Sequence, residues 1–325
     1  MNTTLEGKRI LVTGGAGFIG SNLVESLLSL GAIVTCFDNL ETGNLKNIEG
    51  FLKNPLFRFI EGDIRNYDDC LKAVEGIELI SHQAALGSVP RSIANPQATN
   101  STNVDGFLNV IQAAKEKGIK RFVFASSSSV YGDSMVSPKV IGSEGNLLSP
   151  YAVTKKLNEL YADVFHRLHG LETIGLRYFN VFGPKQDPNG VYAAAIPKFI
   201  EKFMKGEEIT IHGDGEQTRD FTYVKNAVNA NIQALSTNNL GAFGNVFNVA
   251  CGQYLSLNQV VESLKSNLER LDLLNANAKI IHGPDRIGDI RNSLADIEAT
   301  QKQLNYSDII HFDEGVMALM NYISQ

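Results

Sequence analysis

Arg9–Gly20 reads R-I-L-V-T-G-G-A-G-F-I-G. The first five residues, Arg9–Thr13, are typical of a buried strand, and Gly14, Gly17 and Gly20 follow at three-residue intervals before an amphipathic segment. Glycines in this position allow a tight turn and a close approach of the backbone to a pyrophosphate, whose charge the helix N-terminus then favours. The stretch therefore predicts a strand, a turn and a helix that together bind a dinucleotide.

Short apolar runs alternate with amphipathic segments over the first two thirds of the chain. The runs that predict strands are Arg9–Thr13, Ala32–Phe37, Arg58–Glu61, Glu78–His82, Arg121–Ala125 and Glu172–Arg177, and the segments that predict helices include Gly20–Leu30, Asn103–Lys117 and Tyr151–His169. Strands that are apolar almost throughout are typical of parallel sheets covered on both faces. The repeated strand–helix–strand order predicts an α/β fold with a doubly wound parallel sheet, a Rossmann fold.

The pattern changes after about Asn180, because Pro and Gly cluster in Phe182–Gly190 and Ile211–Glu216. We expect a dinucleotide-binding domain over residues 1–180 and a smaller C-terminal substrate domain over residues 181–325. Val246–Ala250 (V-F-N-V-A) reads as one more buried strand, which predicts a return of the chain to the sheet. With 325 residues and 43% hydrophobic content, the chain is large enough for two domains.

Composition narrows the class of partner. The net charge of -6 argues against nucleic acid as the main partner. No apolar run reaches the roughly 18 residues that a membrane-spanning helix needs. The apolar run near the N-terminus is broken by Thr13 and four glycines, so it does not predict a signal peptide. The expected location is the cytoplasm.

Cysteine and histidine spacing gives no sign of a metal or a disulfide framework. Cys36, Cys70 and Cys251 are odd in number and contain no C-x-x-C pair, so we expect buried free thiols. The six histidines include no H-E-x-x-H spacing, and no metal site is predicted.

Asp38 ends the second predicted strand, 18 residues after Gly20. A carboxylate at about that distance accepts hydrogen bonds from the adenosine ribose of a dinucleotide. No Lys or Arg follows until Lys46, so a 2′-phosphate would be repelled at Asp38. The sequence therefore predicts NAD in preference to NADP, and the alternative for Asp38 is an exposed turn carboxylate.

Three further segments follow predicted strands and should face the cofactor. They are Gly62–Ile64 (G-D-I), His82–Ala85 (H-Q-A-A) and Asn103. Ligands of open α/β sheets bind at the carboxyl ends of the strands, and the small residues of Q-A-A allow a close approach. For His82 itself, a satisfied interior histidine is the favoured interpretation.

Tyr151 and Lys155 lie four residues apart in Y-A-V-T-K, so on a helix they share one face. Ser127 follows the predicted strand Arg121–Ala125 and should lie at its carboxyl end. Oxidising a sugar hydroxyl requires a base, and a free tyrosine has a pKa near 10. A lysine ammonium and the positive nicotinamide both favour the phenolate, and Ser127 can hold the same sugar oxygen. The trio predicts an NAD-dependent enzyme, whereas a tyrosine that only packs is the alternative.

These motifs resemble the extended short-chain dehydrogenases/reductases, specifically the nucleotide-sugar 4-epimerases. The resemblance covers nearly the whole chain and rests on G-G-A-G-F-I-G, S-S-S-S-V-Y-G, Y-A-V-T-K, L-R-Y-F-N-V-F-G-P, G-D-G-E-Q-T-R-D-F and R-I-G-D. L-G-S-V-P-R-S and D-P-N-G-V-Y-A-A-A-I-P are similar to segments of UDP-N-acetylglucosamine 4-epimerases from bacterial surface-polysaccharide pathways. The resemblance also implies a homodimer that packs Asn103–Lys117 and Tyr151–His169 as a four-helix bundle.

The resemblance implies a reaction and a set of site residues. Tyr151 deprotonates the 4-hydroxyl of a UDP-sugar while NAD takes the hydride, the 4-keto sugar turns its other face, and the hydride returns. The implied cofactor residues are Gly14, Gly17, Phe18, Ile19, Gly20, Asp38, Asn39, Gly43, Asp63, Ile64, Gln83, Ala84, Ala85, Asn103, Tyr151, Lys155 and Tyr178. The implied substrate residues are Ser88, Ser127, Ser128, Ser129, Tyr151, Asn180, Arg219, Arg286, Asp289 and Ser293, with Arg219, Arg286 and Asn180 at the pyrophosphate.

Two positions separate close relatives by the same resemblance. Ser128 and Ser129 stand where 4,6-dehydratases carry an Asp and a Glu, which disfavours dehydration, and Ser129 likewise disfavours decarboxylation of UDP-glucuronate. Ser293 stands where epimerases restricted to UDP-glucose and UDP-galactose carry a tyrosine, so we expect N-acetylated substrates. UDP-glucose and a UDP-N-acetylglucosamine uronic acid remain alternatives, and Arg91 is a candidate cation for the latter.

A protein of another class, a non-catalytic NAD-binding sensor, could keep the same fold. Such a protein has no need of Ser127, Tyr151 and Lys155 together, and this chain carries all three. Taken without the resemblance, Arg219 beside Asp220 reads equally well as a surface ion pair.

Overall fold

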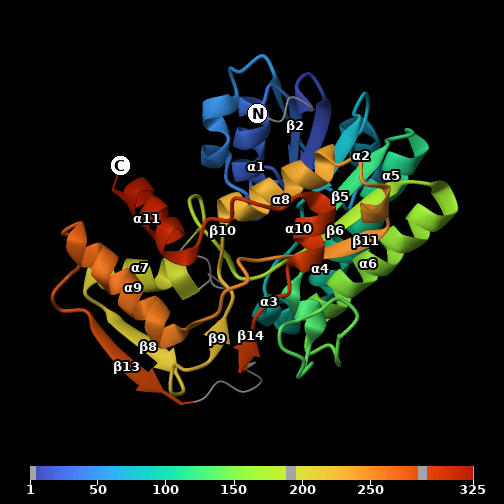
Figure 1. Ribbon diagram of the computed structural model, residues 1–325. Helices are drawn as coiled ribbons and strands as arrows, with labels where there is room; N and C mark the ends of the chain where they lie inside the picture. The colour runs from blue at the N-terminus through green and yellow to red at the C-terminus, as the bar shows by residue number, and fades with distance from the viewer. Residues whose placement is uncertain (1–4, 188–194, 285–290, 325) are drawn as a thin grey trace.

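The computed structural model describes residues 5–187, 195–284 and 291–324. Its larger lobe is built on seven strands in the order β11-β6-β5-β4-β1-β2-β3. These strands are β1 (Arg9–Thr13), β2 (Ile33–Asp38), β3 (Phe57–Glu61), β4 (Leu79–His82), β5 (Arg121–Ser127), β6 (Glu172–Tyr178) and β11 (Asn245–Val249). Every neighbouring pair is parallel, which confirms the predicted doubly wound sheet (Figure 1).

Helices cover both faces of this sheet. They are α1 (Phe18–Ser29), α2 (Tyr67–Ala73), α5 (Gly106–Glu116), α6 (Pro150–His169) and α8 (Val224–Ser236). Two short helices, α3 (Val89–Ala94) and α4 (Pro96–Asn100), pack against α6. Side chains of β1 alternate between the faces: Val12 joins the core formed with α1 and α8, whereas Leu11 joins the core formed with α2, α5 and α6. Both faces are therefore buried, as the apolar strands require.

The boundaries of α6 follow from its sequence. The Ser149 side chain accepts a hydrogen bond from the backbone N–H of Ala152 at 3.1 Å, and Pro150 occupies the first turn. Gly170, with φ +67°, ends the helix in a left-handed conformation. These signals fix the helix that carries Tyr151 and Lys155.

The smaller lobe lies to one side of the sheet, at the lower left of Figure 1. It contains α7 (Ala195–Lys205), β8 (Glu208–His212), α9 (Leu257–Arg270), β13 (Lys279–Gly283) and α11 (Phe312–Ile323), and the short elements β7 (Val181–Phe182), β9 (Thr218–Arg219), β10 (Thr222–Tyr223), β12 (Leu255–Ser256) and β14 (Asn292–Ser293). The helix α10 (Glu298–Leu304) packs instead against β11 and α8 of the larger lobe. The helix α8 and the strand β11 come after residue 180 and pack on or extend the sheet. The chain therefore crosses between the lobes more than once.

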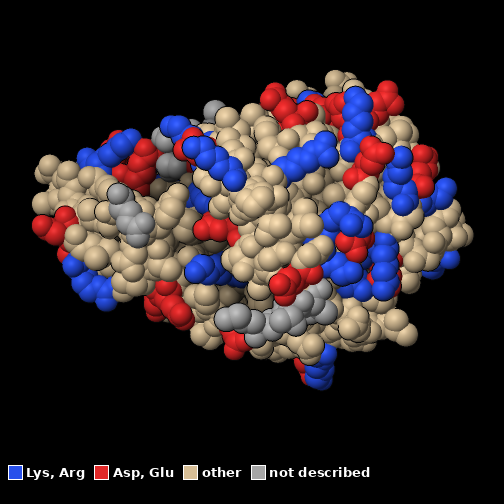
Figure 2. All heavy atoms as spheres, turned by 90° about the horizontal axis from the view of Figure 1, so that it is seen from above, with Lys and Arg blue, Asp and Glu red and all other residues tan. Residues whose placement is uncertain are grey.

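The cysteine prediction is confirmed, because Cys36, Cys70 and Cys251 are free and buried. Among the described residues, no helix has the length and apolar content to cross a membrane. The same residues contain no group of three or more His, Cys, Asp or Glu side chains that could hold a metal. On the face shown in Figure 2, cationic and anionic side chains are interspersed.

Candidate active site

A cavity of about 350 Å³ opens at the carboxyl ends of β1, β2, β4 and β5. Most of the predicted cofactor residues line it: Gly14, Gly17, Phe18, Ile19, Gly20, Asp38, Asn39, Ile64, Gln83, Ala84, Ala85, Tyr151, Lys155 and Tyr178. Gly43, Asp63 and Asn103 are not among the residues that line it. Parallel strands bring these distant segments to one edge of the sheet, where open α/β sheets bind ligands.

The glycine turn fits a dinucleotide. Gly14 has φ +65°, and a Cβ there would lie 2.7 Å from the backbone of Ala84. A Cβ on Gly20 would lie 2.1 Å from the carbonyl oxygen of Gly14. Gly17 is the N-cap of α1 and offers no side-chain cap, so the first N–H groups of the helix are left for a ligand. The turn therefore packs as a cradle for a diphosphate.

Asp38 is buried at the end of β2 and lines the cavity, so it is not an exposed turn carboxylate. Its oxygens accept hydrogen bonds from the backbone N–H groups of Ala16 at 3.0 Å and Leu40 at 2.8 Å. Burial raises the pKa of Asp38, and these two hydrogen bonds oppose the rise. A Cβ on Gly43 would lie 2.8 Å from the carboxylate, so Gly43 makes room for Asp38.

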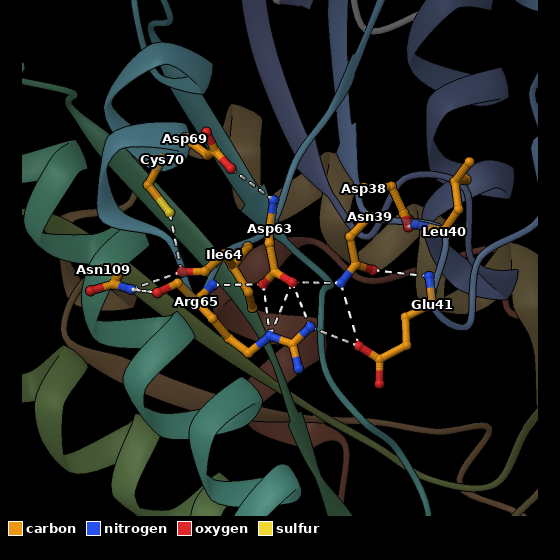
Figure 3. Close-up of polar contacts among 10 residues, drawn as sticks. All are labelled: Asp38, Asn39, Leu40, Glu41, Asp63, Ile64, Arg65, Asp69, Cys70 and Asn109. Carbon is orange, nitrogen blue, oxygen red and sulfur yellow. Dashed lines mark hydrogen bonds and ion pairs between the residues drawn. The ribbon is translucent and has the colours of Figure 1, made fainter.

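Asp63 ties together the loops that follow β2 and β3 (Figure 3). Its carboxylate accepts hydrogen bonds from Arg65 Nε at 2.9 and 3.0 Å and from Asn39 Nδ2 at 2.9 Å. Arg65 Nη2 also contacts Glu41 Oε2 at 2.9 Å. The Arg65 guanidinium lowers the pKa of Asp63 to about 2. The sequence pointed to Asp63 but missed Arg65, for which the acid–base spacing in G-D-I-R is the available signal.

Asn103 anchors the loop after β4. Its Oδ1 accepts from the backbone N–H of Leu86 at 2.8 Å, and its Nδ2 donates to Leu86 O at 3.2 Å and to Thr154 Oγ1 at 3.1 Å. The preceding residue, Thr102, lines the cavity, and its buried hydroxyl has no hydrogen-bond partner among the described residues. Thr102 lies in a π-helical turn, Ser101–Asp105, where a regular helix was expected to start at Asn103. Thr102 is therefore a candidate cofactor contact that the sequence did not show.

Gln83 and Tyr178, which both line the cavity, are joined by a hydrogen bond. The Tyr178 hydroxyl donates to Gln83 Oε1 at 3.0 Å and accepts from Asn231 Nδ2, on α8, at 2.7 Å. Gln83 Nε2 donates to Ser81 Oγ at 2.9 Å. This network fixes both side chains before any ligand enters.

His82 is the satisfied interior histidine that we expected. Its Nδ1 lies 2.9 Å from Thr13 Oγ1, and its ring packs against Phe107 and Phe122. Burial lowers the pKa of His82 to about 3, so the ring is neutral near pH 7.

The structure brings Ser127, Tyr151 and Lys155 together between β5 and α6. Lys155 Nζ donates to Ala125 O at 2.8 Å and lies 5.9 Å from the centre of the Tyr151 ring. Tyr151 shares a hydrogen bond with the Ser127 hydroxyl. Ser127 Oγ also accepts from the backbone N–H of Ser129 at 3.1 Å. The three polar groups thus lie together, and two of them, on Tyr151 and Lys155, line the cavity.

Burial has the largest effect on the pKa values of Tyr151 and Lys155. Burial raises the pKa of Tyr151, and the hydrogen bond from Ser127 opposes this only in part. That Lys155 and the nicotinamide together favour the phenolate stays a prediction for the enzyme with its cofactor bound. Burial also lowers the pKa of Lys155 to about 8, because a buried ammonium loses its hydration.

The predicted substrate residues Ser88, Ser128 and Ser129 lie at or in short helical segments that follow β4 and β5. Ser128 and Ser129 belong to a 3₁₀ turn, Ser128–Tyr131, and the buried Ser129 hydroxyl has no partner among the described residues. Ser88 is the N-cap of α3, with φ +109°, and accepts a hydrogen bond from the Arg91 backbone at 3.3 Å. A non-glycine residue in this conformation is strained, which is a feature of ligand-binding loops.

The remaining predicted substrate residues meet in the smaller lobe. Ser293 on β14 is the register partner of Arg219 on β9. The backbone N–H of Asp220 donates to Ser293 O at 2.9 Å, and Asn180 Nδ2 donates to Asp220 O at 3.0 Å. Asp220 itself is fully buried, so it is not a surface residue. Arg286 and Asp289 lie outside the described residues.

A Rossmann fold with a glycine cradle, a buried carboxylate after β2 and a Ser–Tyr–Lys trio defines a dinucleotide-dependent enzyme. The profile of the NAD dependent epimerase/dehydratase family matches residues 10–250. The chain belongs to this family, within the extended short-chain dehydrogenases/reductases. It is an NAD-dependent enzyme of the nucleotide-sugar 4-epimerase/dehydratase group.

Several relatives cover nearly the whole chain. A UDP-N-acetylglucosamine 4-epimerase from Methanobrevibacter ruminantium, solved with UDP-N-acetylmuramic acid, is 37% identical with a TM-score of 0.89, over 98% of this chain and 99% of that one. A UDP-glucuronic acid 4-epimerase from Bacillus cereus, solved with UDP-glucuronic acid and NAD, is 30% identical with a TM-score of 0.87, over 97% and 99%. The UDP-glucose 4-epimerase of Mycolicibacterium smegmatis is 32% identical over 316 residues, 97% of this chain and 98% of that protein.

Proposed function

We propose that this enzyme interconverts UDP-N-acetylglucosamine and UDP-N-acetylgalactosamine by inverting carbon 4, in the cytoplasm, for surface-polysaccharide synthesis. The observation that carries the proposal is the pairing of a complete Ser127–Tyr151–Lys155 trio with the short Ser293 side chain beside Arg219. The trio supports proton transfer at a sugar hydroxyl, and the small residue supports space for a 2-acetamido group.

The chain's own residues bind and orient the UDP-sugar and move one proton. NAD, which the residues that line the cavity would hold, would supply the acceptor and donor of the hydride of carbon 4. The Tyr151 oxygen removes the proton of the 4-hydroxyl and returns it, while Ser127 holds the same sugar oxygen. Lys155 places a buried positive charge beside the phenol. Arg219 and Arg286 offset the diphosphate charge, so the UDP portion supplies binding energy while the sugar stays free to turn.

Dehydration of the sugar is less well supported than epimerisation. Ser128 and Ser129 bring no acid or base to the sugar, so elimination of water lacks its groups. UDP-glucose and a UDP-N-acetylglucosamine uronic acid remain alternative substrates, and the relative solved with UDP-glucuronic acid is the reason to include a uronic acid.

The test is to incubate the purified protein separately with UDP-N-acetylglucosamine, UDP-glucose and UDP-N-acetylglucosaminuronic acid, and to separate the products by anion-exchange chromatography. We expect UDP-N-acetylgalactosamine to form fastest. If none of the three sugars is converted, the protein is not an epimerase of these sugars and the sensor alternative gains support.

Tyr151→Phe removes the phenol oxygen but keeps the ring. We expect kcat for UDP-N-acetylglucosamine to fall by about 10²–10⁴-fold, the range for a positioned acid or base. Tyr161→Phe, at an exposed position of the same helix, is the matched control and should leave kcat unchanged. Equal rates for wild type and Tyr151→Phe would remove Tyr151 from the mechanism.

A further inference from the structure

A buried carboxylate lies behind the trio. Glu159 is one turn after Lys155 and two turns after Tyr151 on α6, so all three share a helix face. Its side chain is 5% exposed. One carboxylate oxygen accepts from Ser126 Oγ at 2.6 Å and from Arg177 Nε at 2.8 Å, and the other accepts from Arg177 Nη2 at 2.8 Å. Glu159 thus joins α6 to β5 and β6.

Successive residues of β5 meet successive turns of α6. Ala125 O accepts from Lys155, Ser126 donates to Glu159, and Ser127 bonds to Tyr151. Ser126 also lines the cavity. Because Ser126 directly precedes Ser127, the Ser126–Glu159 bond fixes where the Ser127 hydroxyl stands relative to the helix.

Glu159 is not needed merely to neutralise Arg177. The Arg177 guanidinium is 1% exposed and also pairs with Glu144 at 2.5 Å. The carboxylates of Glu144 and Glu159 therefore share one buried arginine, and Lys155 lies one turn before Glu159 on the same helix. A buried charge without compensation is costly, so a cation is required nearby. Lys156, at 3.4 Å from Glu159, supplies part of that charge from a more exposed position.

We propose that Glu159 is the positioning residue of the active site: it fixes the end of β5 through Ser126, and its carboxylate keeps the buried Lys155 ammonium charged beside Tyr151. The inference rests on the proposed roles of Tyr151 and Lys155.

The charge environment supports this role. Burial lowers the pKa of Lys155 to about 8, and the Glu159 carboxylate opposes that lowering. The other titratable or charged groups around this pair are Tyr151, Lys156, His82, Arg177, Glu144 and Tyr131. His82 is neutral in the working pH range, because burial lowers its pKa to about 3.

The sign of the effect follows from these charges. Lysine is charged below its pKa, so loss of a nearby carboxylate lowers the pH at which Lys155 becomes neutral. Above that pH the phenolate of Tyr151 has no ammonium beside it. The alkaline limb of the pH profile of kcat should therefore move to lower pH when Glu159 loses its charge.

Glu159→Gln keeps an acceptor oxygen for Ser126 but removes the charge. We expect the alkaline limb of kcat to move down by about one pH unit, the low end of the range for loss of an adjacent opposite charge. Glu144→Gln is the matched control, since it removes the other carboxylate of Arg177, and should leave the limb in place. Glu159→Asp keeps the negative charge but withdraws it by one methylene. Its alkaline limb should therefore lie close to that of wild type, whereas its kcat should be lower than that of wild type because the shorter side chain loses its reach to Ser126.

A second readout does not depend on turnover. In cofactor-free protein with ¹³C-labelled lysine, NMR titration of the Lys155 signal, assigned with Lys155→Arg, should show a lower pKa in Glu159→Gln than in wild type. Should Glu159→Gln fail to fold, Ser126→Ala tests the first part of the proposal, that Glu159 fixes the end of β5 through Ser126. It should lower kcat several-fold with KM and the alkaline limb unchanged, and Ser126→Thr should restore kcat.

The two proposals fail differently. If the wild type converts a UDP-sugar and requires Tyr151, but Glu159→Gln leaves both the alkaline limb and the Lys155 titration where they are in wild type, the role of Glu159 is wrong. A Ser126→Ala enzyme with wild-type kcat would equally overturn the first part of the proposal. If no UDP-sugar is converted, the proposed function fails, and the NMR titration still tests the coupling of Glu159 to Lys155.

Discussion

Ser293 controls the space available to the sugar in the proposed function. Its backbone is fixed by the register with Arg219 and by the 2.9 Å hydrogen bond from Asp220, so a larger side chain cannot move away by shifting the strand. Ser293→Tyr should abolish turnover of UDP-N-acetylglucosamine and spare UDP-glucose in a side-by-side product assay. Ser293→Ala, which adds no bulk, should turn over both sugars. Equal loss of both activities in Ser293→Tyr would contradict the proposal that the size of this side chain selects the sugar.

Single residues show where sequence reasoning succeeds. The helical spacing of Tyr151 and Lys155 and the strand-end position of Ser127 are local properties, and the structure places all three together. Thr102 could not be found in this way, because the π-helical turn changes the helix register by a residue. The raised pKa of Tyr151 was also missed, since burial depends on contacts from several distant segments.

Among the elements, the Asp63–Arg65 pair joins the loops that follow β2 and β3 at the cofactor cavity (Figure 3). Arg65→Ala removes this connection and should weaken NAD binding about two- to fivefold, because a half-exposed ion pair contributes about 1 kcal/mol or less. Isothermal titration calorimetry with NAD measures the change. Arg58→Ala, at an exposed position of β3, is the control. If it weakens NAD binding as much as Arg65→Ala does, the loss comes from the removed positive charge and not from the broken connection between the loops.

The same ion pair predicts a pH dependence. The pKa of Asp63 is lowered from its usual 3.8 to about 2, so its contribution to stability is present above about pH 4 and is lost as pH falls toward 2. The difference in thermal unfolding temperature between wild type and Asp63→Asn should therefore shrink between pH 5 and pH 3. A difference that stays constant or grows in that range would contradict the pairing.

Element boundaries were predictable wherever a long apolar period exists. The predicted strand Arg9–Thr13 and the structure agree residue for residue, and α6 begins one residue before the predicted Tyr151. The two-residue strands β9, β12 and β14 were not foreseen. Strands this short have no period to detect, and they form because distant segments meet.

For the molecule as a whole, we propose that the chain forms the homodimer that the family resemblance predicts, through the outer face of α6 together with α5. Leu160 and Leu168 on this helix are 52% and 70% exposed, and Val153 and Val164 lie on the same helix with 42% and 36% exposed. Leu160→Lys should raise the dimer dissociation constant by at least about tenfold, because charge in an apolar interface is costly. Light scattering across a dilution series measures this constant, with Leu240→Lys, at an 80% exposed position outside α6, as control. A wild type that is monomeric throughout would overturn the dimer.

The path of the chain limits how evolution or an engineer can recombine this protein. Because β11 forms an edge of the central sheet after the chain has already built part of the smaller lobe, a single crossover near residue 180 would join a sheet from one parent to an edge strand from another. The apolar contacts of Phe247 and Val249 would then have to match a foreign β6 and α8. Chimaeras that exchange substrate preference should therefore graft β9 and β14 individually and leave β11 with its own sheet.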